Sequence, residues 1–338
     1  MHKSELIALI KFFSVKKAVN VTRLYLSFIV SRFFKKSFIS GLPFALSIEP
    51  TTSCNLGCPE CPSGLKQFTR KTGNLSIALN KKIIDELKGR LTYINYYFQG
   101  EPYINKNFFD FVQYANSKKI FCSTSTNGHF LNDENCVKTI ESGLKRLIIS
   151  IDGNSQETYE IYRKKGKYKK VIDGTKNIIK WKKELKSEYP HVIFQFLVVK
   201  TNEHLIEEMK TLAADLEVDE LRLKTAQFYN FKNGNELIPD NEKYSRYRKT
   251  KNGNYILKNK FSNHCWRMWS SAVVTSKGGI APCCFDKDAV NTLGNLEKEN
   301  FEKVWLSKKY NDFRKQIFSD RKEIEICQNC SEGSKVWA

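Results

Sequence analysis

At 338 residues, the chain is long enough for one large domain and a small one, each with its own core. Its 41% hydrophobic and 13% aromatic content excludes an intrinsically disordered chain. The formal net charge of +20 indicates a negatively charged partner, but it is spread along the chain and carries no information about fold. Ten cysteines without a recognisable secretory leader favour a reducing cytoplasm, where thiols bind metal, over a disulfide framework.

Residues 1–40 read as a basic, amphipathic preface of one or two helices. The longest uncharged stretch near its centre, Leu24 to Ser31, is eight residues long, whereas a transmembrane helix needs about 20. The early apolar run from Leu6 to Ile10 is too short for a signal-peptide core of about 7 to 15 residues. The segment is therefore expected to pack on the protein itself, to bind a partner, or to lie on an anionic membrane surface. We expect a cytoplasmic protein, with peripheral contact at the inner membrane face if the last alternative holds.

From residue 41 to 230, β-type apolar runs alternate with helix-period stretches, which is typical of βα units and a parallel sheet. The six strand-like runs are 45–49, 93–98, 121–126, 146–151, 192–199 and 220–224. The helical patterns between them are 78–88, 107–117, 133–142, 168–185 and 204–216. Six such units predict an α/β fold that closes as a partial (β/α)6 TIM barrel, with its chemistry at the carboxyl ends of the strands.

The first strand-like run is followed by Cys54, Cys58 and Cys61, three thiols within eight residues. An iron–sulfur cube held by three thiolates keeps one iron open for an outside ligand. Structural zinc sites prefer paired Cys-x2-Cys units and four protein ligands. From the triplet alone, the alternatives are a zinc knuckle, a disulfide pair with a spare thiol, or three unrelated buried cysteines.

This Cys-x3-Cys-x2-Cys loop resembles the signature of the radical S-adenosylmethionine (SAM) superfamily. The resemblance implies that the open iron chelates SAM, that an electron from the cluster splits the sulfonium, and that a 5′-deoxyadenosyl radical removes a hydrogen from substrate. It also implies an electron donor such as flavodoxin or ferredoxin. The residue before the third cysteine is usually aromatic in this superfamily and here is Glu60. Because the implied contact with adenine is largely through backbone, we keep Glu60 as a cofactor-binding residue.

The second strand-like run ends in Gln99-Gly100-Glu101-Pro102. Gly100 allows close backbone approach to a ligand, and Glu101 can accept a charge-assisted hydrogen bond from an ammonium group. The sequence resembles the Gly-Gly-Glu-Pro motif that receives the amino group of SAM, with Gln99 in place of the first glycine. Taken alone, the four residues are also consistent with an ordinary turn.

The fourth strand-like run ends in Ser150-Ile151-Asp152-Gly153, and Arg163 follows thirteen residues after Ser150. Ser-x-Asp-Gly with a downstream arginine resembles the fourth-strand motif of the superfamily. The resemblance implies that Ser150 contacts SAM and that Arg163 pairs with its carboxylate through the guanidinium fork. An arginine after a helix is also consistent with a solvated charge. The basic tract 164–170 is expected to be a solvated face, and no nucleic acid is expected as partner.

Residues 231–262 are rich in Asn, Lys and Gly and read as an irregular connection. Beyond them we expect a hairpin over 271–282, a helix over 301–317, and a second set of cysteines. This set comprises Cys265, Cys283, Cys327 and Cys330, which would close a full coordination shell. Cys284 can replace Cys283, which is chosen because it lies eighteen residues beyond Cys265. Cys122 and Cys136 are expected in the core.

The C-terminal cysteines resemble the SPASM/twitch extension of radical SAM enzymes, in the short form with one auxiliary [4Fe-4S] cluster. A four-cysteine zinc site takes the same ligands and is the chief alternative. The expected organisation is thus a helical segment at 1–40, a radical SAM barrel at 41–230, a connection at 231–262 and a cluster domain at 263–338. The auxiliary cluster would assist oxidation or bond formation on a small, carbohydrate-like molecule or a peptide, with a slight preference for the former. The competing hypothesis is a zinc-dependent, non-catalytic module that binds nucleic acid.

Overall fold

The computed structural model describes residues 3–259 and 262–332, and these form two compact units. The first unit takes the described residues up to 53, then 68–123, then those from 262 onward. The second takes 54–67 and the described residues from 124 to 259. Each unit therefore joins segments that lie far apart in the sequence, and the domain boundaries expected from the sequence stay a prediction.

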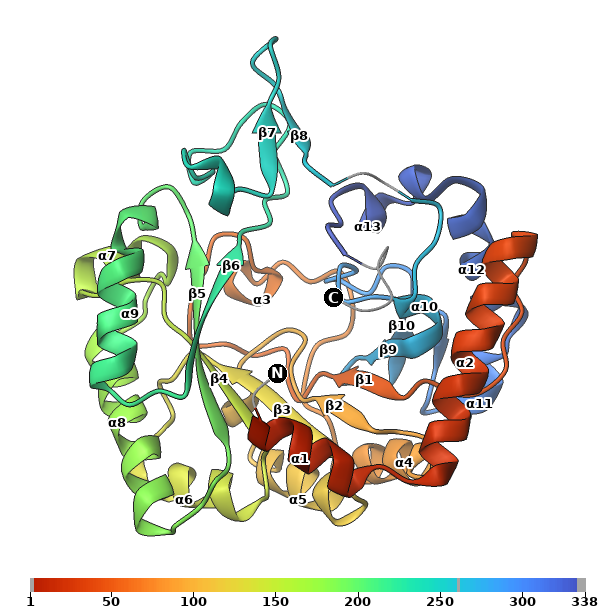
Figure 1. Ribbon diagram of the computed structural model, residues 1–338, viewed down its shortest axis with the longest axis horizontal. Helices are drawn as coiled ribbons and strands as arrows, with labels where there is room; N and C mark the ends of the chain where they lie inside the picture. Colours follow the sequence, from red (N-terminus) through yellow and green to blue (C-terminus); the bar gives the residue numbers. More distant parts are fainter. Residues whose placement is uncertain (1–2, 260–261, 333–338) are drawn as a thin grey trace. The chain divides into compact units, whose positions relative to one another are not determined.

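The first unit begins with two helices, α1 (Lys3–Phe12) and α2 (Val15–Phe34), as predicted for residues 1–40 (Figure 1). Ser14 caps α2 by accepting a hydrogen bond from the backbone N–H of Lys17. The inner face of α2 is buried through Phe28, whose ring centroid lies 5.3 Å from those of Trp266 and Trp269. The preface thus packs on its own protein along one face. In the described chain, no helix is long and apolar enough to cross a membrane.

The sheet of the first unit has the strand order β11-β10-β9-β1-β2-β3. Its strands are β1 (Ala45–Ile48), β2 (Tyr93–Asn95), β3 (Phe121–Thr126), β9 (Ser271–Val274), β10 (Gly279–Ala281) and β11 (Gly294–Asn295). Strands β1, β2 and β3 are parallel, and β3 ends within the second unit. Strand β9 pairs in parallel with β1, with Ala45 opposite Ser271 (Figure 1). The C-terminal hairpin therefore extends the same sheet as β1 rather than standing apart from it.

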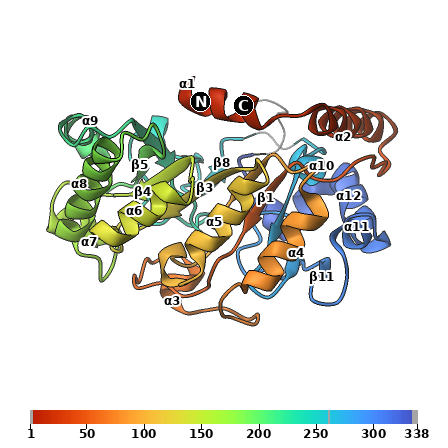
Figure 2. The same cartoon turned by 90° about the horizontal axis from the view of Figure 1, so that it is seen from below.

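The remaining elements of the first unit are helical. They are α4 (Ile77–Leu87), η1 (Pro102–Ile104), α5 (Phe108–Ser117), α10 (Arg267–Ser270), α11 (Phe301–Trp305), α12 (Lys308–Asp320), η4 (Arg321–Glu323) and α13 (Glu325–Gln328). Helices α4 and α5 lie side by side (Figure 2). The helix expected over 301–317 is broken after α11, because Ser307 caps α12 by accepting from the N–H of Tyr310.

The second unit contains the parallel strands β4 (Arg146–Ser150), β5 (His191–Val198) and β6 (Glu220–Thr225) in that order. Its helices are α3 (Pro62–Leu65), α6 (Asp133–Glu141), α7 (Gln156–Tyr162), α8 (Tyr168–Glu184), η2 (Glu203–Leu205), α9 (Ile206–Asp215) and η3 (Glu242–Tyr244). Helices α6 and α8 pack against each other (Figure 2). The 231–262 stretch is more ordered than expected, since it contains the hairpin of β7 (Tyr247–Lys249) and β8 (Tyr255–Leu257).

All six strands expected between residues 41 and 230 are confirmed, as is the mixed α/β class with a parallel sheet. Helix α7 was not expected as a separate element. It is short, and its start depends on a capping box between Ser155 and Thr158 rather than on an apolar period.

Candidate metal centres

The loop of Cys54, Cys58 and Cys61 is shaped by backbone contacts within the second unit. The N–H of Gly57 donates to the carbonyl of Lys164 at 2.9 Å, and the N–H of Cys61 donates to the carbonyl of Cys58 at 3.3 Å. Helix α3 begins directly after Cys61. A Cβ on Gly64 would lie 2.6 Å from the backbone nitrogen of Cys58, so only glycine lets this helix close on the loop.

An apolar cluster encloses the loop. Buried side chains of this cluster include Leu56, Cys58, Tyr162, Phe228, Phe231 and Tyr247, and both Cys54 and Cys61 pack against it. The rings of Phe231 and Tyr247 stack with centroids 4.5 Å apart. The segment beyond β6 thus packs aromatic side chains against the cysteine loop, in which Cys58 is buried while Cys54 and Cys61 are partly exposed.

Polar donors point at two of the three sulfurs. The Nδ2 of Asn127 lies 3.9 Å from the Sγ of Cys54 and donates to the Oδ1 of Asn55 at 2.7 Å. The Nη1 of Arg163 lies 3.9 Å from the Sγ of Cys58. Burial raises the pKa of the Cys58 thiol, and the Arg163 guanidinium works in the opposite direction. Donors of this kind favour thiolate over thiol, so the loop fits a metal cluster that takes thiolate ligands.

Arg163 is held by Asp152, a role that the sequence did not reveal. The Nε of Arg163 donates to Asp152 Oδ2 at 2.5 Å, and the Asp152 side chain is fully buried. Its other oxygen accepts from the N–H of Leu197 at 2.8 Å, while Asn202 Nδ2 donates to its backbone carbonyl at 3.0 Å. Asp152 is thus a positioning residue. Its signal in the sequence was the Asp of Ser-x-Asp-Gly, directly after a buried strand.

The side chain of Glu60 forms hydrogen bonds with the segment after β6 that covers the cysteine loop. Its carboxylate accepts from the N–H of Tyr229 at 3.0 Å and from Asn235 Nδ2 at 3.4 Å. The signal for this role in the sequence is the carboxylate itself, which stands where the superfamily usually has an aromatic residue. The side chain of Glu60 therefore fastens the segment after β6 to the cysteine loop.

Ser150 lies at the end of β4 and is buried, with its Oγ 3.5 Å from that of Ser125. In the first unit, Gly100 has φ +73°, and a Cβ there would lie 2.2 Å from the carbonyl oxygen of Thr51. The next residue, Glu101, is buried and donates its N–H to the carbonyl of Ser53 at 2.8 Å. The glycine is therefore required by the packing of its own turn on the chain after β1, whatever ligand the turn receives.

Three of the C-terminal cysteines, Cys265, Cys327 and Cys330, are buried in the first unit beside Arg321. The buried guanidinium donates from Nη2 to the Sγ of Cys330 at 3.3 Å and from Nη1 to the carbonyl of His264 at 3.0 Å. Burial raises the pKa of Cys327 to about 11, and Arg321 opposes this shift. A buried arginine among thiols is best compensated when the thiols are thiolates, so this donor set also fits a metal cluster.

Cys283 and Cys284 follow β10. A hydrogen bond with Cys284 raises the pKa of Cys283, and burial adds to this shift. Cys284 packs against Val273, Ala281 and Ala289, which form a small apolar cluster. None of the ten cysteines, all of which are described, forms a disulfide. In the described residues, no three His, Cys, Asp or Glu side chains are grouped as ligands of a single metal ion.

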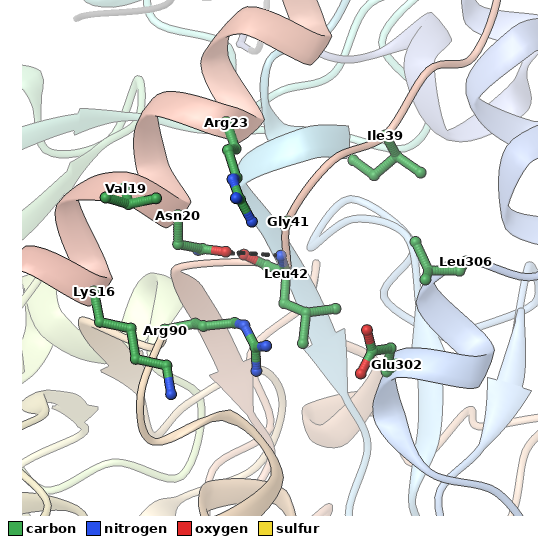
Figure 3. Close-up of a pocket in the computed structure, with 10 residues that line it drawn as sticks. All are labelled: Lys16, Val19, Asn20, Arg23, Ile39, Gly41, Leu42, Arg90, Glu302 and Leu306. Carbon is green, nitrogen blue, oxygen red and sulfur yellow. Dashed lines mark hydrogen bonds between the residues drawn. The ribbon is translucent and has the colours of Figure 1, made fainter.

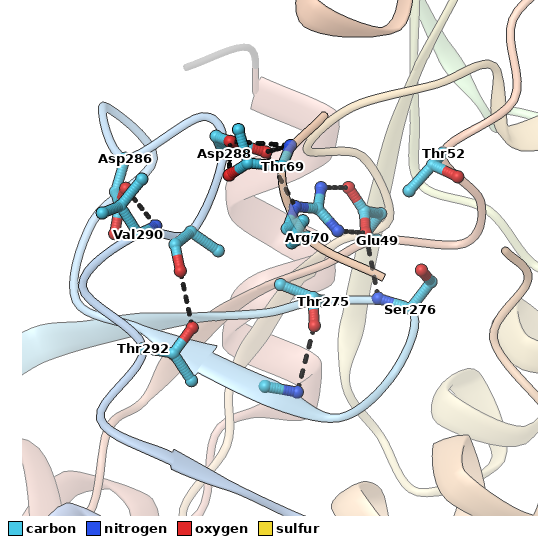
Figure 4. Close-up of polar contacts among 12 residues, drawn as sticks. Glu49, Thr52, Thr69, Arg70, Thr275, Ser276, Asp286, Asp288, Val290 and Thr292 are labelled. Atoms are coloured by element: carbon cyan, nitrogen blue, oxygen red, sulfur yellow. Dashed lines mark hydrogen bonds and ion pairs between the residues drawn. The ribbon is translucent and has the colours of Figure 1, made fainter. Parts of the chain in front are cut away.

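An ion pair between the buried Glu49 and the partly buried Arg70 links several loops of the first unit (Figure 4). Arg70 donates to both oxygens of Glu49, at 2.6 and 2.9 Å, and Glu49 also accepts from the N–H of Ser276 at 3.0 Å. The neighbouring Thr69 donates its N–H to the carboxylate of Asp288. The network joins the end of β1, the segment from 68 to 70, the turn between β9 and β10, and the loop after Cys284. Sequence reasoning missed it because its members are distant in the chain.

The sequence matches two family profiles. Residues 48–216, half of the chain, match the Radical SAM superfamily, and residues 265–331 match SPASM, described as an iron–sulfur cluster-binding domain. The PqqA peptide cyclase of Rhodopseudomonas palustris is 27% identical over 203 residues, which is 59% of this chain and 52% of that protein. The mycofactocin maturase MftC of Mycobacterium ulcerans is 30% identical over 145 residues, or 42% of this chain and 39% of that protein. The chain thus spans about half or less of the length of these relatives.

Among solved structures, BtrN in complex with AdoMet and 2-DOIA is similar in fold. It has a TM-score of 0.54 at 19% identity, and the match covers 87% of this chain and 95% of that one. The chain belongs to the radical SAM superfamily of enzymes and carries a SPASM domain. The cofactors of this class are SAM, a [4Fe-4S] cluster that binds it, and an auxiliary iron–sulfur cluster. The family match replaces the hypothesis of a zinc-dependent nucleic-acid-binding module.

Proposed function

We propose that Cys54, Cys58 and Cys61 hold the SAM-binding [4Fe-4S] cluster of an enzyme that abstracts hydrogen from its substrate. The observation that carries this assignment is the enclosed loop with Arg163 and Asn127 directed at two of its sulfurs. When bound, the cluster and SAM together supply the 5′-deoxyadenosyl radical. The chain's own contribution is to supply three thiolates, to pack aromatic side chains against their loop, and to fix the donors that face the sulfurs.

For SAM itself, we assign Gly100, Glu101, Ser150 and Arg163, together with the backbone of Glu60. Asp152 occupies the Nε of Arg163, which leaves the Nη groups as the part of the guanidinium near Cys58. A carboxylate is the partner that a guanidinium fork fits best. The buried carboxylate of Glu101 suits an ammonium group, because a positive partner stabilises a charge held away from water.

For the auxiliary cluster, we assign Cys265, Cys283, Cys327 and Cys330. Arg321 supports this choice, since it places positive charge among three of these four thiols. Cys284 is assigned to packing, because it lies against Val273, Ala281 and Ala289. Four thiolates on one cluster leave no open iron, so this site suits electron transfer rather than SAM binding.

For the substrate, we propose a small, carbohydrate-like molecule, with a peptide as the second candidate. BtrN was solved in complex with 2-DOIA, which supports the first. The similarity to a PqqA peptide cyclase supports the second. Incubating the reduced enzyme with either class of candidate and following deuterium transfer from substrate into 5′-deoxyadenosine distinguishes them.

We further propose flavodoxin or ferredoxin as electron donor and a cytoplasmic location with peripheral membrane contact through residues 1–40. The membrane contact is supported by the charge of this segment, which contains eight Lys and Arg residues and only one acidic residue, Glu5. It is also supported by the apolar side chains that α1 and α2 leave exposed.

The test of the enzymatic proposal is anaerobic reduction in the presence of SAM, with 5′-deoxyadenosine measured by chromatography. We expect the wild-type protein to form 5′-deoxyadenosine and Cys58→Ala to form none. Cys136→Ala is the matched control, because this thiol is buried in α6, away from both cysteine sets in the sequence. Product formation by Cys58→Ala equal to that of the control would contradict the assignment.

A further inference from the structure

A cavity of about 340 Å³ lies in the first unit beside α2 (Figure 3). Its wall is formed by α2, by the chain between α2 and β1, by Arg90 from the connection between α4 and β2, and by α11. None of the residues assigned to SAM or to the clusters lines it. The cavity therefore has no role in the proposed reaction.

Two hydrogen bonds and a close glycine contact join α2 to the chain before β1 at the cavity. The buried side chain of Asn20 donates to the carbonyl of Leu42 at 2.7 Å and accepts from the N–H of Leu42 at 3.0 Å. The intervening Gly41 has φ +110°, and a Cβ there would lie 2.9 Å from Asn20 Oδ1. The side chain of Asn20 thus forms two hydrogen bonds with the backbone of Leu42, and these link the chain before β1 to α2.

Three cations and one carboxylate line the cavity. Arg23 extends toward the pair of Asn20 and Leu42, Arg90 and Lys16 lie on the other side of that pair, and Glu302 comes from α11 (Figure 3). Within the described chain, the side chains of Lys16, Arg23 and Arg90 form no ion pair. Three positive charges against one carboxylate leave the lining with a net positive charge, and a phosphate between two guanidinium groups offsets that charge while accepting forked hydrogen bonds.

The surface next to the cavity is apolar. Of the twenty large apolar side chains that are exposed in the described chain, twelve lie between Leu6 and Phe38, with Val15 81% and Phe33 80% exposed. Val19 belongs both to this exposed set and to the cavity wall, and so does Leu306 of the facing segment. On α2, the exposed apolar residues Val15, Val19, Leu26 and Phe33 share one helical face, which Lys16 and Arg23 border.

We propose that this cavity binds the phosphodiester headgroup of an anionic phospholipid, while the exposed apolar face of α2 enters the membrane surface. A soluble phosphate compound would use the arginines but would leave the adjoining apolar face in water. A second copy of the chain would bring two basic faces together, which charge repulsion opposes. The inference rests on the proposed membrane contact of residues 1–40 and not on the cluster chemistry.

The experiment uses the full-length protein in flotation with phosphatidylcholine vesicles that contain or lack phosphatidylglycerol. Truncation of the preface is unsuitable, because Phe28 belongs to the core. The cavity variant is Arg23→Ala with Arg90→Ala. The control is Arg32→Ala with Lys36→Ala, which removes the same charge from two exposed residues at the end of the same segment.

We expect the wild-type protein to float with phosphatidylglycerol vesicles, and the cavity variant to bind them about tenfold more weakly than the control variant. Both variants lose general attraction to the anionic surface, but only the cavity variant loses charge-assisted hydrogen bonds to the headgroup. Equal binding by the two variants would overturn the proposal.

Calorimetric titration with monomeric short-chain phosphatidylglycerol and with inorganic phosphate separates the two sources of phosphate. We expect the short-chain lipid to bind more tightly, and equal affinity would show that the apolar face has no part in the site. If neither the wild-type protein nor a variant floats with either kind of vesicle, the proposed membrane contact is wrong, and so is the proposed headgroup site. Formation of 5′-deoxyadenosine by the same preparations reports separately on the enzymatic proposal, since neither arginine belongs to it.

Discussion

At the scale of single residues, Glu60 departs from the superfamily pattern and has a structural role in this fold. Its carboxylate accepts two hydrogen bonds from the segment that covers the cysteine loop. We predict that Glu60→Ala lowers the free energy of opening this cover by about 1–3 kcal/mol, the usual effect of removing a charged acceptor. Hydrogen exchange at Tyr229 and its neighbours measures the opening. Unchanged protection in Glu60→Ala would show that the apolar contacts alone hold the cover, and Glu60→Gln, which keeps an acceptor, should lose less than Glu60→Ala.

Glu49 and Arg70 form the second residue-scale feature. Glu49 is fully buried at the end of β1, and both of its carboxylate oxygens accept hydrogen bonds from Arg70. Replacing Arg70 by Met leaves an uncompensated buried carboxylate, so we predict a loss of about 3–5 kcal/mol in the free energy of unfolding. The double variant Glu49→Gln, Arg70→Met should recover much of this loss, because it removes the unpaired charge. Urea unfolding of the apoprotein measures both, and equal stability of the single and double variants would contradict the prediction.

At the scale of elements, the start of α8 is linked to the end of β3 through His129. The Nε2 of His129 accepts from the N–H of Lys167 at 2.8 Å, so Nδ1 carries the proton and faces the Asn127 carbonyl. Burial lowers the pKa of His129 from its ordinary value. The hydrogen bond with the Asn127 backbone opposes this shift, and the positive charges of Lys170 and Arg163 add to it. A protonated His129 has no acceptor left for Lys167.

It follows that the protein loses stability when the pH falls through the range in which His129 takes up a proton. Because the folded pKa lies below the unfolded one, the unfolded chain takes up the proton first as pH decreases. We predict that His129→Gln, which does not titrate, loses less stability than the wild-type protein between about pH 7 and about pH 5. Urea unfolding at both pH values measures this difference. Parallel losses in the two proteins would mean that other groups dominate the acid response.

The elements that the sequence predicted are those defined by local pattern. Strands β1 to β6 and the long helices have apolar periods that survive any tertiary arrangement. The pairing of β9 with β1 and the hairpin of β7 and β8 were not predictable, since pairing between distant segments leaves no local periodicity. The cysteines that we propose as ligands were recognisable by their spacing. Their supports, Asp152, Asn127 and Arg321, were not, because a buried polar residue near a metal site has the same local sequence as an ordinary one.

At the scale of the whole molecule, the two cysteine sets predict two clusters that load independently. Anaerobically purified protein should contain about eight irons. We predict that Cys283→Ala retains about four irons, whereas its neighbour variant Cys284→Ala retains about eight, because only Cys283 belongs to the proposed ligand set. Iron analysis and absorption near the visible cluster bands measure this. The reverse pattern would make Cys284 the ligand and Cys283 the packing residue.

The proposed function requires an open iron at the loop of Cys54, Cys58 and Cys61. The most direct test is electron–nuclear double resonance of the reduced protein with SAM labelled in its methionine carboxylate and amino groups. We predict hyperfine coupling of these labels to the cluster in the wild-type protein and in Cys283→Ala, and its loss in Cys58→Ala. A reduced cluster that shows no coupling to labelled SAM, with full iron loading, would contradict the account.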